Sequence, residues 1–254
     1  VKSFWLDWSG FSDSITTRLW TSPKIFAHHW QHLLQSRICC FWSWTEIAMA
    51  SASVRHFARM SAVPFSVYQA ILRTRGYYNI AELIGQYKTQ IWGLIETNMG
   101  GYFHAASSLL DRIDGAQNRF LHELDVTPAT AFLEFNFAPP SLRRNIGILG
   151  LLHKRVLGKR HPSFESLFPF EINPPRGHTK QLYGHWCEIS THQAIFNRSI
   201  FRMCDIYNNL PQQVVDTPSV HLFQKALTLR VRQRCEDGNE DWALFFSRRA
   251  GPDV

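Results

Sequence analysis

Six cationic side chains lie close together in the middle of the sequence, and their chemistry suits contacts to phosphate groups. They are Arg143, Arg144, Lys154, Arg155, Lys159 and Arg160. No Asp or Glu occurs between Phe135 and Phe164, and cations without a counter-charge repel one another unless salt or a polyanion screens them. Two interpretations stay open: a solvated helix face, and a surface that contacts the backbone of nucleic acid.

The overall charge favours the second interpretation. The chain has a formal net charge of +7 and a sequence pI near 9.3. A basic balance of this kind is typical of proteins that bind polyanions, most often nucleic acid. We therefore expect a nucleic-acid partner, with the six cations as the candidate binding residues.

The sequence offers no group of residues suited to catalysis. No adjacent Asp-Asp pair occurs in the 254 residues, whereas a polymerase uses clustered carboxylates to hold two divalent ions. His122-Glu123 lacks the second His of a zinc-protease motif. Asp111 and Asp114 could hold a metal ion, but acids near the start of a helix are explained more simply by its dipole. We predict no catalytic residue, no metal site and no cofactor in this chain.

The cysteines and the hydropathy indicate an intracellular setting. The five cysteines are an odd number without a Cys-x-x-Cys pair, which is typical of reduced thiols rather than of disulfides or zinc ligands. No run of eighteen apolar residues and no signal peptide is recognised. We expect a nuclear or cytoplasmic protein with no membrane partner.

Residues 1–62 differ in composition from the rest of the chain. They contain six of the nine tryptophans but only three acids, and their aromatic residues keep neither a helical nor a strand period. One interpretation is an aromatic surface that stacks on single-stranded nucleic acid. The favoured one is an irregular leader, disordered or non-native, because stacking requires aromatic side chains on a regular scaffold.

From residue 63 onward the apolar spacing predicts a mainly α fold, a helical bundle. Asn79 and Glu82 have the spacing of a capping box, and Ser107 or Ser108 can begin the next long helix. The clearest helix begins at Ser141, carries four of the six cations and ends at Gly158. These elements group residues 63–160 into one helical region.

Residues 161–235 predict a helical extension. Weak strand character predicts a small β-hairpin near residues 180–196. Thr217, with Pro218 after it, has the pattern of a cap that begins the last long helix. The polar residues 236–254 are expected to form a frayed tail.

Several segments, taken in order, resemble the region that follows the polymerase core in non-LTR retrotransposon reverse transcriptases. They are RTRGYYN at 73–79, QYK at 86–88 with Glu96, LDRIDGAQNRFL at 110–121, RRN at 143–145, LGLLHK at 149–154 and YNNLP at 207–211. Each segment alone is modest, but their order and spacing are fairly specific. The family's palm motif with its paired aspartates, its fingers and its endonuclease do not occur in these residues.

The resemblance implies a thumb-like region, which in this family grips the template–primer backbone largely without reading sequence. The expected function is that of a reverse transcriptase fragment, inactive alone, that binds RNA or an RNA–DNA hybrid. Magnesium and the chemistry of RNA-directed DNA polymerisation would belong to the missing palm, a further partner. The alternatives are a helical protein-interaction module and an inert retroelement relic.

Overall fold

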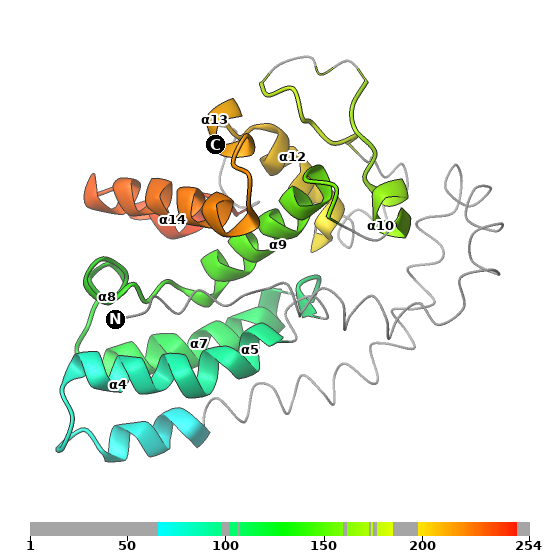
Figure 1. The fold of residues 1–254 in the computed structure, drawn as a ribbon. Coiled ribbons are helices and arrows are strands. Elements are labelled where there is room, and N and C mark those ends of the chain that lie inside the picture. The colour runs from blue at the N-terminus through cyan, green and yellow to red at the C-terminus, as the bar shows by residue number, and fades with distance from the viewer. Residues whose placement is uncertain are drawn as a thin grey trace, which may run out of the picture.

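The structure is a computed structural model that describes residues 66–97, 102–105, 107–159, 162–172, 174, 177–184 and 198–247. Within these ranges the chain is mainly helical and contains no β-strand (Figure 1). The prediction of a mainly α fold is therefore confirmed. The predicted leader, residues 1–62, lies outside the described residues.

The first group of helices begins with a helix whose described part spans 66–73. It continues with α4 (Ile80–Tyr87), the π-helical turn η1 (Lys88–Trp92), α5 (Gly93–Thr97) and α7 (Ser107–Glu123). The predicted capping box is present, because Asn79 Oδ1 accepts from Glu82 N at 2.9 Å and Glu82 Oε2 accepts from Asn79 N at 3.0 Å.

Aromatic side chains fill the core of this first group. The ring centroid of Tyr87 lies 4.6 Å from that of Phe120 and 5.2 Å from that of Phe137. The ring of Trp92 stacks on that of Phe137, with the centroids 5.1 Å apart. A buried polar residue on α7, Gln117, accepts from Trp92 Nε1 at 3.2 Å and donates to the carbonyl of Ala138 at 3.0 Å. Both polar ends of its side chain amide are satisfied, which explains its place on an apolar stripe.

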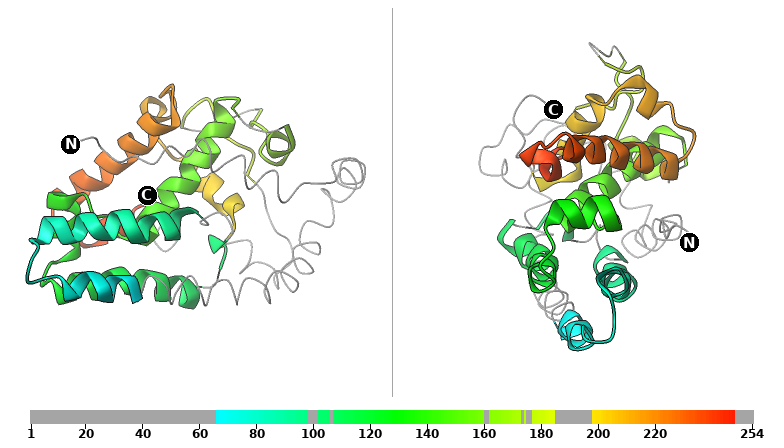
Figure 2. Two further views of the ribbon diagram at one scale, coloured as in Figure 1. Left: turned by 60° about the horizontal axis from the view of Figure 1, so that its bottom comes forward. Right: turned by 90° about the vertical axis from the view of Figure 1, so that its left-hand side faces the viewer.

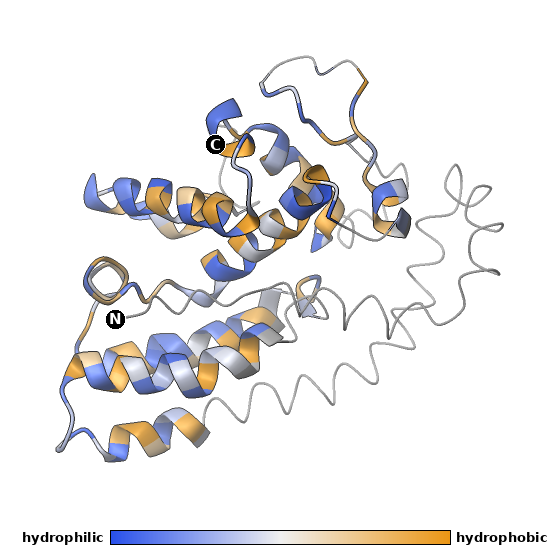
Figure 3. Ribbon diagram, in the orientation of Figure 1, coloured by the Kyte–Doolittle hydropathy of each residue, from blue (hydrophilic) through white to orange (hydrophobic). Residues whose placement is uncertain are grey.

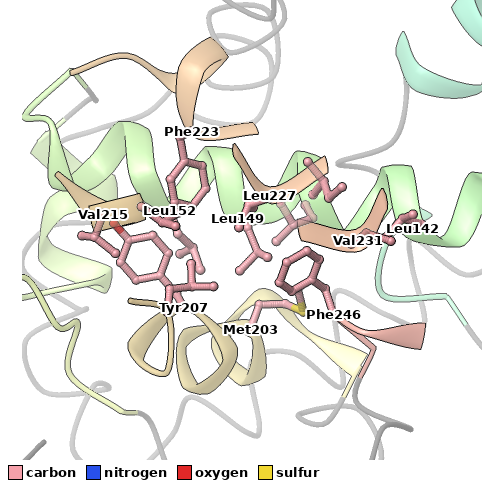
Figure 4. Packing of buried hydrophobic residues seen from close by; sticks show 14 of the residues in the cluster. Leu142, Leu149, Leu152, Met203, Tyr207, Val215, Phe223, Leu227, Val231 and Phe246 are labelled. Carbon is pink, nitrogen blue, oxygen red and sulfur yellow. The ribbon is translucent and has the colours of Figure 1, made fainter. Parts of the chain in front are cut away.

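The second group of helices packs around α9. It consists of α8 (Pro128–Phe135), α9 (Pro140–Val156), α10 (Pro162–Leu167), α12 (Ile200–Asn208), α13 (Gln212–Val215), α14 (Val220–Glu236) and the 3-10 turn η3 (Glu240–Leu244). Figure 3 shows that these helices are amphipathic, and Figure 4 shows the leucines of α9 meeting the apolar face of α14. A Cβ at Gly150 would lie 2.5 Å from Gln224 Nε2, so the missing side chain permits the close approach of α14.

Two predicted helix boundaries have different outcomes. The end of α9 is confirmed, because Gly158 has a φ of +69°, the left-handed conformation that glycine adopts most easily. The predicted start at Thr217 is wrong, because Ser219 caps α14 by accepting from Leu222 N at 3.2 Å. Thr217 Oγ1 instead donates to the Val214 carbonyl at 2.8 Å, at the end of α13.

The residues after α14 correct another prediction. Trp242 and Phe246 are 7% and 1% exposed, and Trp242 stacks on Phe132 of α8 with ring centroids 5.0 Å apart. The prediction of a frayed tail is therefore wrong up to residue 247, because these two large side chains complete the second core. Residues 248–254 lie outside the described residues.

Only the first part of the predicted hairpin near residues 180–196 lies among the described residues. Leu182 forms an antiparallel bridge with Phe170, supported by bonds from Glu171 N to Gln181 O at 2.9 Å and from Tyr183 N to Pro169 O at 2.8 Å. The predicted partner stretch lies outside the described residues. Within the described part, residues 181–183 therefore pair with the segment that follows α10.

Candidate nucleic-acid interface

Arg144, the most deeply buried of the predicted binding residues, pairs with an acid from the first group of helices. Its Nη1 and Nη2 donate to the two carboxylate oxygens of Asp114 at 2.6 and 2.7 Å, and the residue is 4% exposed. Burial lowers the pKa of Arg144, but the hydrogen bonds and negative charge of Asp114, together with Tyr102 and Asp111, raise that pKa overall. The guanidinium stays charged and joins α9 to α7.

Arg143 is held in the same way by a second acid. Its guanidinium pairs with the carboxylate of Glu96 on α5 and lies over the ring of Trp92, 3.4 Å from the centroid. Burial raises the pKa of Glu96, while the neighbouring Arg143 acts against that rise. The guanidinium charge of Arg143 is thus paired with Glu96, and one face of the group is covered by Trp92. Most of the surface of Arg143 therefore faces other protein groups.

Arg155 is the third predicted residue that the fold uses internally. It is 8% exposed, its Nε donates to the Phe168 carbonyl at 3.0 Å, and its Nη1 lies 3.8 Å from a carboxylate oxygen of Glu165. Its guanidinium also lies over the ring of Phe170 at 4.6 Å. Arg155 therefore fixes the segment after α10 against α9.

The six predicted residues thus do not form one exposed cationic surface. Lys154 is half-buried, Lys159 is exposed, and Arg160 lies outside the described residues. The inference that the cluster lacks counter-charges is wrong for Arg143, Arg144 and Arg155. The sequence is free of acids locally, but folding brings in carboxylates from 47 and 30 residues away for the first two.

A turn between the 66–73 helix and α4 presents a different set of groups. Thr74 Oγ1 donates to the Ile71 carbonyl at 2.7 Å, Arg75 N to Leu72 O at 3.1 Å, and Tyr77 N to Thr74 O at 2.9 Å. The capping box then begins α4. Hydrogen bonds therefore hold the 73–78 turn at both ends, at the lower left edge of the structure in Figure 1.

The side chains of the 73–78 turn are unusually open. Tyr77 is 88% exposed and Tyr78 is 45% exposed. Arg73 and Arg75 are exposed, and neither has an ion pair among the described residues. Arginine contacts phosphates, and tyrosine rings stack on unpaired bases.

A shallow hollow adjoins the turn. Its wall includes Arg75, Tyr78 and Ile80 on one side, and Glu123 and Leu124 at the end of α7 on the other. The carboxylate of Glu123 disfavours phosphate on the far side of this hollow. Phosphate contacts are therefore expected on the side of the arginines, with the tyrosines next to them.

The sequence had not marked this turn as a site. Its residues belong to the segment RTRGYYN, which supports only the resemblance to reverse transcriptases. The signal that could have found it is local: two arginines and two tyrosines within six residues around one glycine. A glycine turn exposes its neighbours, and exposed aromatic rings beside cations are the components of a stacking site.

Two histidines are buried and act in the fold. His153 on α9 lies 3.0 Å from the Tyr207 hydroxyl through Nδ1 and 3.0 Å from the Thr217 carbonyl through Nε2. Since a carbonyl only accepts, Nε2 carries the proton and Nδ1 accepts from Tyr207. Burial lowers the pKa of His153 to about 4, against the opposing effect of the bond to Thr217. His178, whose pKa burial also lowers, bonds the Tyr207 carbonyl at 3.0 Å.

The described residues offer no metal group and no membrane span. No three His, Cys, Asp or Glu side chains come together there in a way that could hold a metal ion, and Asp114 is bonded to Arg144. No helix in this part of the chain is both long enough and apolar enough to cross a membrane.

Comparison with protein-family models, with curated proteins and with solved structures finds no match to this chain. The resemblance to reverse transcriptases therefore depends on the sequence segments alone.

Proposed function

We propose that the chain is a thumb-like region of a non-LTR retrotransposon reverse transcriptase that binds RNA or an RNA–DNA hybrid without reading sequence. The observation that carries this proposal is the 73–78 turn, where two exposed arginines without an ion pair in the described structure stand beside two exposed tyrosines. The arginines contact phosphates, and the tyrosines stack on bases that are not paired. The proposal places the protein inside the cell, in the nucleus or the cytoplasm.

The distribution of charge supports a polyanionic partner. Residues 140–235 contain fourteen Lys and Arg but five Asp and Glu. Although Arg143, Arg144 and Arg155 are paired internally, the summed field of such a region attracts a polyanion at a distance. The buried arginines shape the fold, while the exposed turn makes the contacts.

A salt titration tests the proposal. Fluorescence anisotropy with a labelled single-stranded RNA is expected to give an affinity that falls steeply with salt. The variant Arg73→Gln/Arg75→Gln removes two phosphate contacts, so the slope of log K against log salt is expected to decrease by about 1.4, at about 0.7 for each contact on a single strand. An affinity of the unchanged chain that does not vary with salt would contradict the proposal.

Two matched controls separate the turn from general effects of charge and aromatic loss. Arg202→Gln removes an exposed arginine that is paired with Asp205 on the same helix, and it is expected to leave the slope nearly unchanged. Tyr77→Ala is expected to weaken RNA binding, whereas Tyr183→Ala, at a tyrosine that is 52% exposed elsewhere, is not. Equal losses in both tyrosine variants would remove the turn from the proposal.

No polymerase activity is proposed for the chain alone. With magnesium, primer–template and nucleotides it is expected to give no extension, because no adjacent aspartate pair occurs in its residues. Polymerisation would require a palm supplied by another part of the protein or by a second chain.

A further inference from the structure

We infer that the hollow beside the 73–78 turn holds one unpaired base of the bound strand and prefers guanine there. This base site deepens the proposed function and rests on it, because the exposed turn must first hold the strand. Contacts along the rest of the strand still read no sequence, and the hollow adds a preference at a single nucleotide. Binding and base preference are separate measurements, so the two proposals can fail separately.

The hollow lies where the start of α4 meets the end of α7. These two helix ends lie at the same end of the first group of helices (Figures 1 and 2). The volume of the hollow is about 630 Å³, within the range of pockets that bind small organic ligands. Hydrogen bonds hold both helix ends, since Asn79 and Glu82 close the capping box of α4 and Val126 N donates to Leu121 O at 3.0 Å after α7. The fold itself therefore keeps the walls of the hollow in place.

The two sides of the hollow carry opposite charge. Arg75, on the side of the turn, is exposed and has no ion pair among the described residues. On the other side Glu123 is exposed, and its carboxylate also has no ion pair in the part of the chain that the structure describes. Glu123 is the last residue of α7, and the carbonyl end of a helix adds partial negative charge. A matching ligand is negative at one end and offers hydrogen-bond donors at the other.

Apolar and aromatic groups line the space between these two sides. Tyr78, which is 45% exposed, stands on the same side as Arg75. The apolar lining consists of Ile80, Ala81, Leu83 and Leu124. A nucleobase has flat faces that stack on aromatic or apolar side chains and a polar edge that makes hydrogen bonds. A nucleotide therefore matches the hollow in three parts: its phosphate suits Arg75, its flat face suits Tyr78 and the apolar lining, and the edge of its base suits Glu123.

The carboxylate of Glu123 distinguishes among the four bases. A carboxylate only accepts hydrogen bonds, and its two oxygens suit a pair of adjacent donors. Guanine alone has two neighbouring donors on its Watson–Crick edge, N1–H and the N2 amino group. Adenine and cytosine place an amino group next to a ring nitrogen that accepts, and uracil places N3–H between two carbonyls, so each brings a lone pair against the carboxylate. Glu123 therefore favours guanine, provided that the base is unpaired and this edge is free.

Fluorescence anisotropy on the whole 254-residue chain tests the inference. The probes are short labelled strands of oligo-uridine that carry guanine, adenine or cytosine at one central position. At equal salt, the guanine strand is expected to bind about five- to tenfold more tightly than the adenine strand, the lower end for a bidentate base contact because the hollow is open to solvent. Inosine, which lacks the N2 amino group of guanine, is expected to lose most of this preference.

Glu123→Gln tests the carboxylate with little change of shape. An amide presents one acceptor and one donor in place of two acceptors, so the variant is expected to lose most of the guanine preference. Its affinity for oligo-uridine is expected to stay the same or rise, because a negative charge near the phosphates is removed. The matched control is Glu134→Gln, which removes an exposed carboxylate of α8 that does not line the hollow and is expected to keep the preference. Circular dichroism checks that both variants are folded.

Three results would overturn the inference. Equal affinity of the unchanged chain for all the strands would show that the hollow reads no base, while salt-dependent binding would leave the proposed function intact. A guanine preference that survives Glu123→Gln would assign the reading of the base to another part of the chain. A variant that binds every RNA strand more weakly by the same factor, but binds the matching DNA strands as before, would place the carboxylate on the ribose hydroxyl. A chain that binds no RNA at any salt would contradict both proposals.

Discussion

Residues 66–139 and residues 140–235 differ in charge. The first region has five Lys and Arg against seven Asp and Glu, and the second has fourteen against five. Both cores combine aromatic and aliphatic side chains. The first centres on the rings of Tyr87, Phe120 and Phe137, and the second joins the aliphatic faces of α9 and α14 to paired rings, such as Phe132 with Trp242. The two regions thus carry opposite net charges, although both are helical and have similar cores.

This difference in charge explains why Arg143 and Arg144, which stand in the densest group of cations in the sequence, are not exposed in the fold. Each carboxylate of the two buried pairs, Glu96 and Asp114, comes from the acidic region, and each arginine, Arg143 and Arg144, comes from the start of α9. Opposite charges of the two regions therefore meet where the regions join. We regard these pairs as the electrostatic joint of the fold.

Breaking one side of this joint is expected to have the largest effect on stability. Asp114→Ala leaves the guanidinium of Arg144 buried without a counter-charge, and loss of one partner of a buried pair costs about 3–5 kcal/mol. The free energy of unfolding in urea, followed by circular dichroism, measures this loss. Asp114→Ala/Arg144→Met, which removes both charges, is expected to lose less. A change below about 0.5 kcal/mol in the single variant, as at ordinary surface sites, would contradict the joint.

Acid is expected to weaken the second region through His153. Its pKa is near 4 in the folded chain and near 6.5 in an unfolded one, so the unfolded chain binds the proton more readily between these values. The contribution of neutral, buried His153 to the free energy of unfolding is therefore complete above about pH 6.5. As the pH falls toward 4, roughly 2–3 kcal/mol of this contribution is lost. His153→Gln is expected to flatten the decrease in unfolding free energy over this interval. An equally steep decrease in the variant would assign the acid sensitivity to other groups.

Exposed ion pairs are expected to have the smallest effect. Arg202 and Asp205 pair on the surface of α12 with both side chains substantially open to solvent, and such pairs contribute about 0–1 kcal/mol. Arg202→Gln is therefore expected to change the free energy of unfolding by less than about 1 kcal/mol. Thermal melts and urea unfolding curves measure this change. A loss as large as that of Asp114→Ala would erase the distinction between the joint and the surface.

Local features of the fold could be predicted from the sequence, and features that depend on distant partners could not. The capping box joins Asn79 and Glu82, which are three positions apart, and the left-handed Gly158 comes directly after the end of an apolar repeat. At the start of α14, Thr217 and Ser219 both offer a capping hydroxyl, and only the end of α13 decides that Thr217 is used there.

The candidate site shows the same limit. Six neighbouring cations could be found from the sequence, but their counter-charges on α5 and α7 could not, because those acids come close only when the two regions pack. The exposure of Tyr77 and Tyr78 likewise depends on what the fold leaves uncovered. The kind of ligand that a side chain can bind can be recognised from its residue type. Whether that side chain is exposed to the ligand depends on how the whole molecule packs.

The most direct test of the account compares the salt dependence of RNA binding in two double variants. Arg73→Gln/Arg75→Gln alters the exposed turn, and Glu96→Gln/Arg143→Met removes a buried pair without changing the net charge. The account predicts that the slope of log K against log salt decreases by about 1.4 in the first variant and stays unchanged in the second, with both variants folded by circular dichroism. A slope that decreases only in the Glu96→Gln/Arg143→Met variant would place the phosphate contact on α9 and contradict the account.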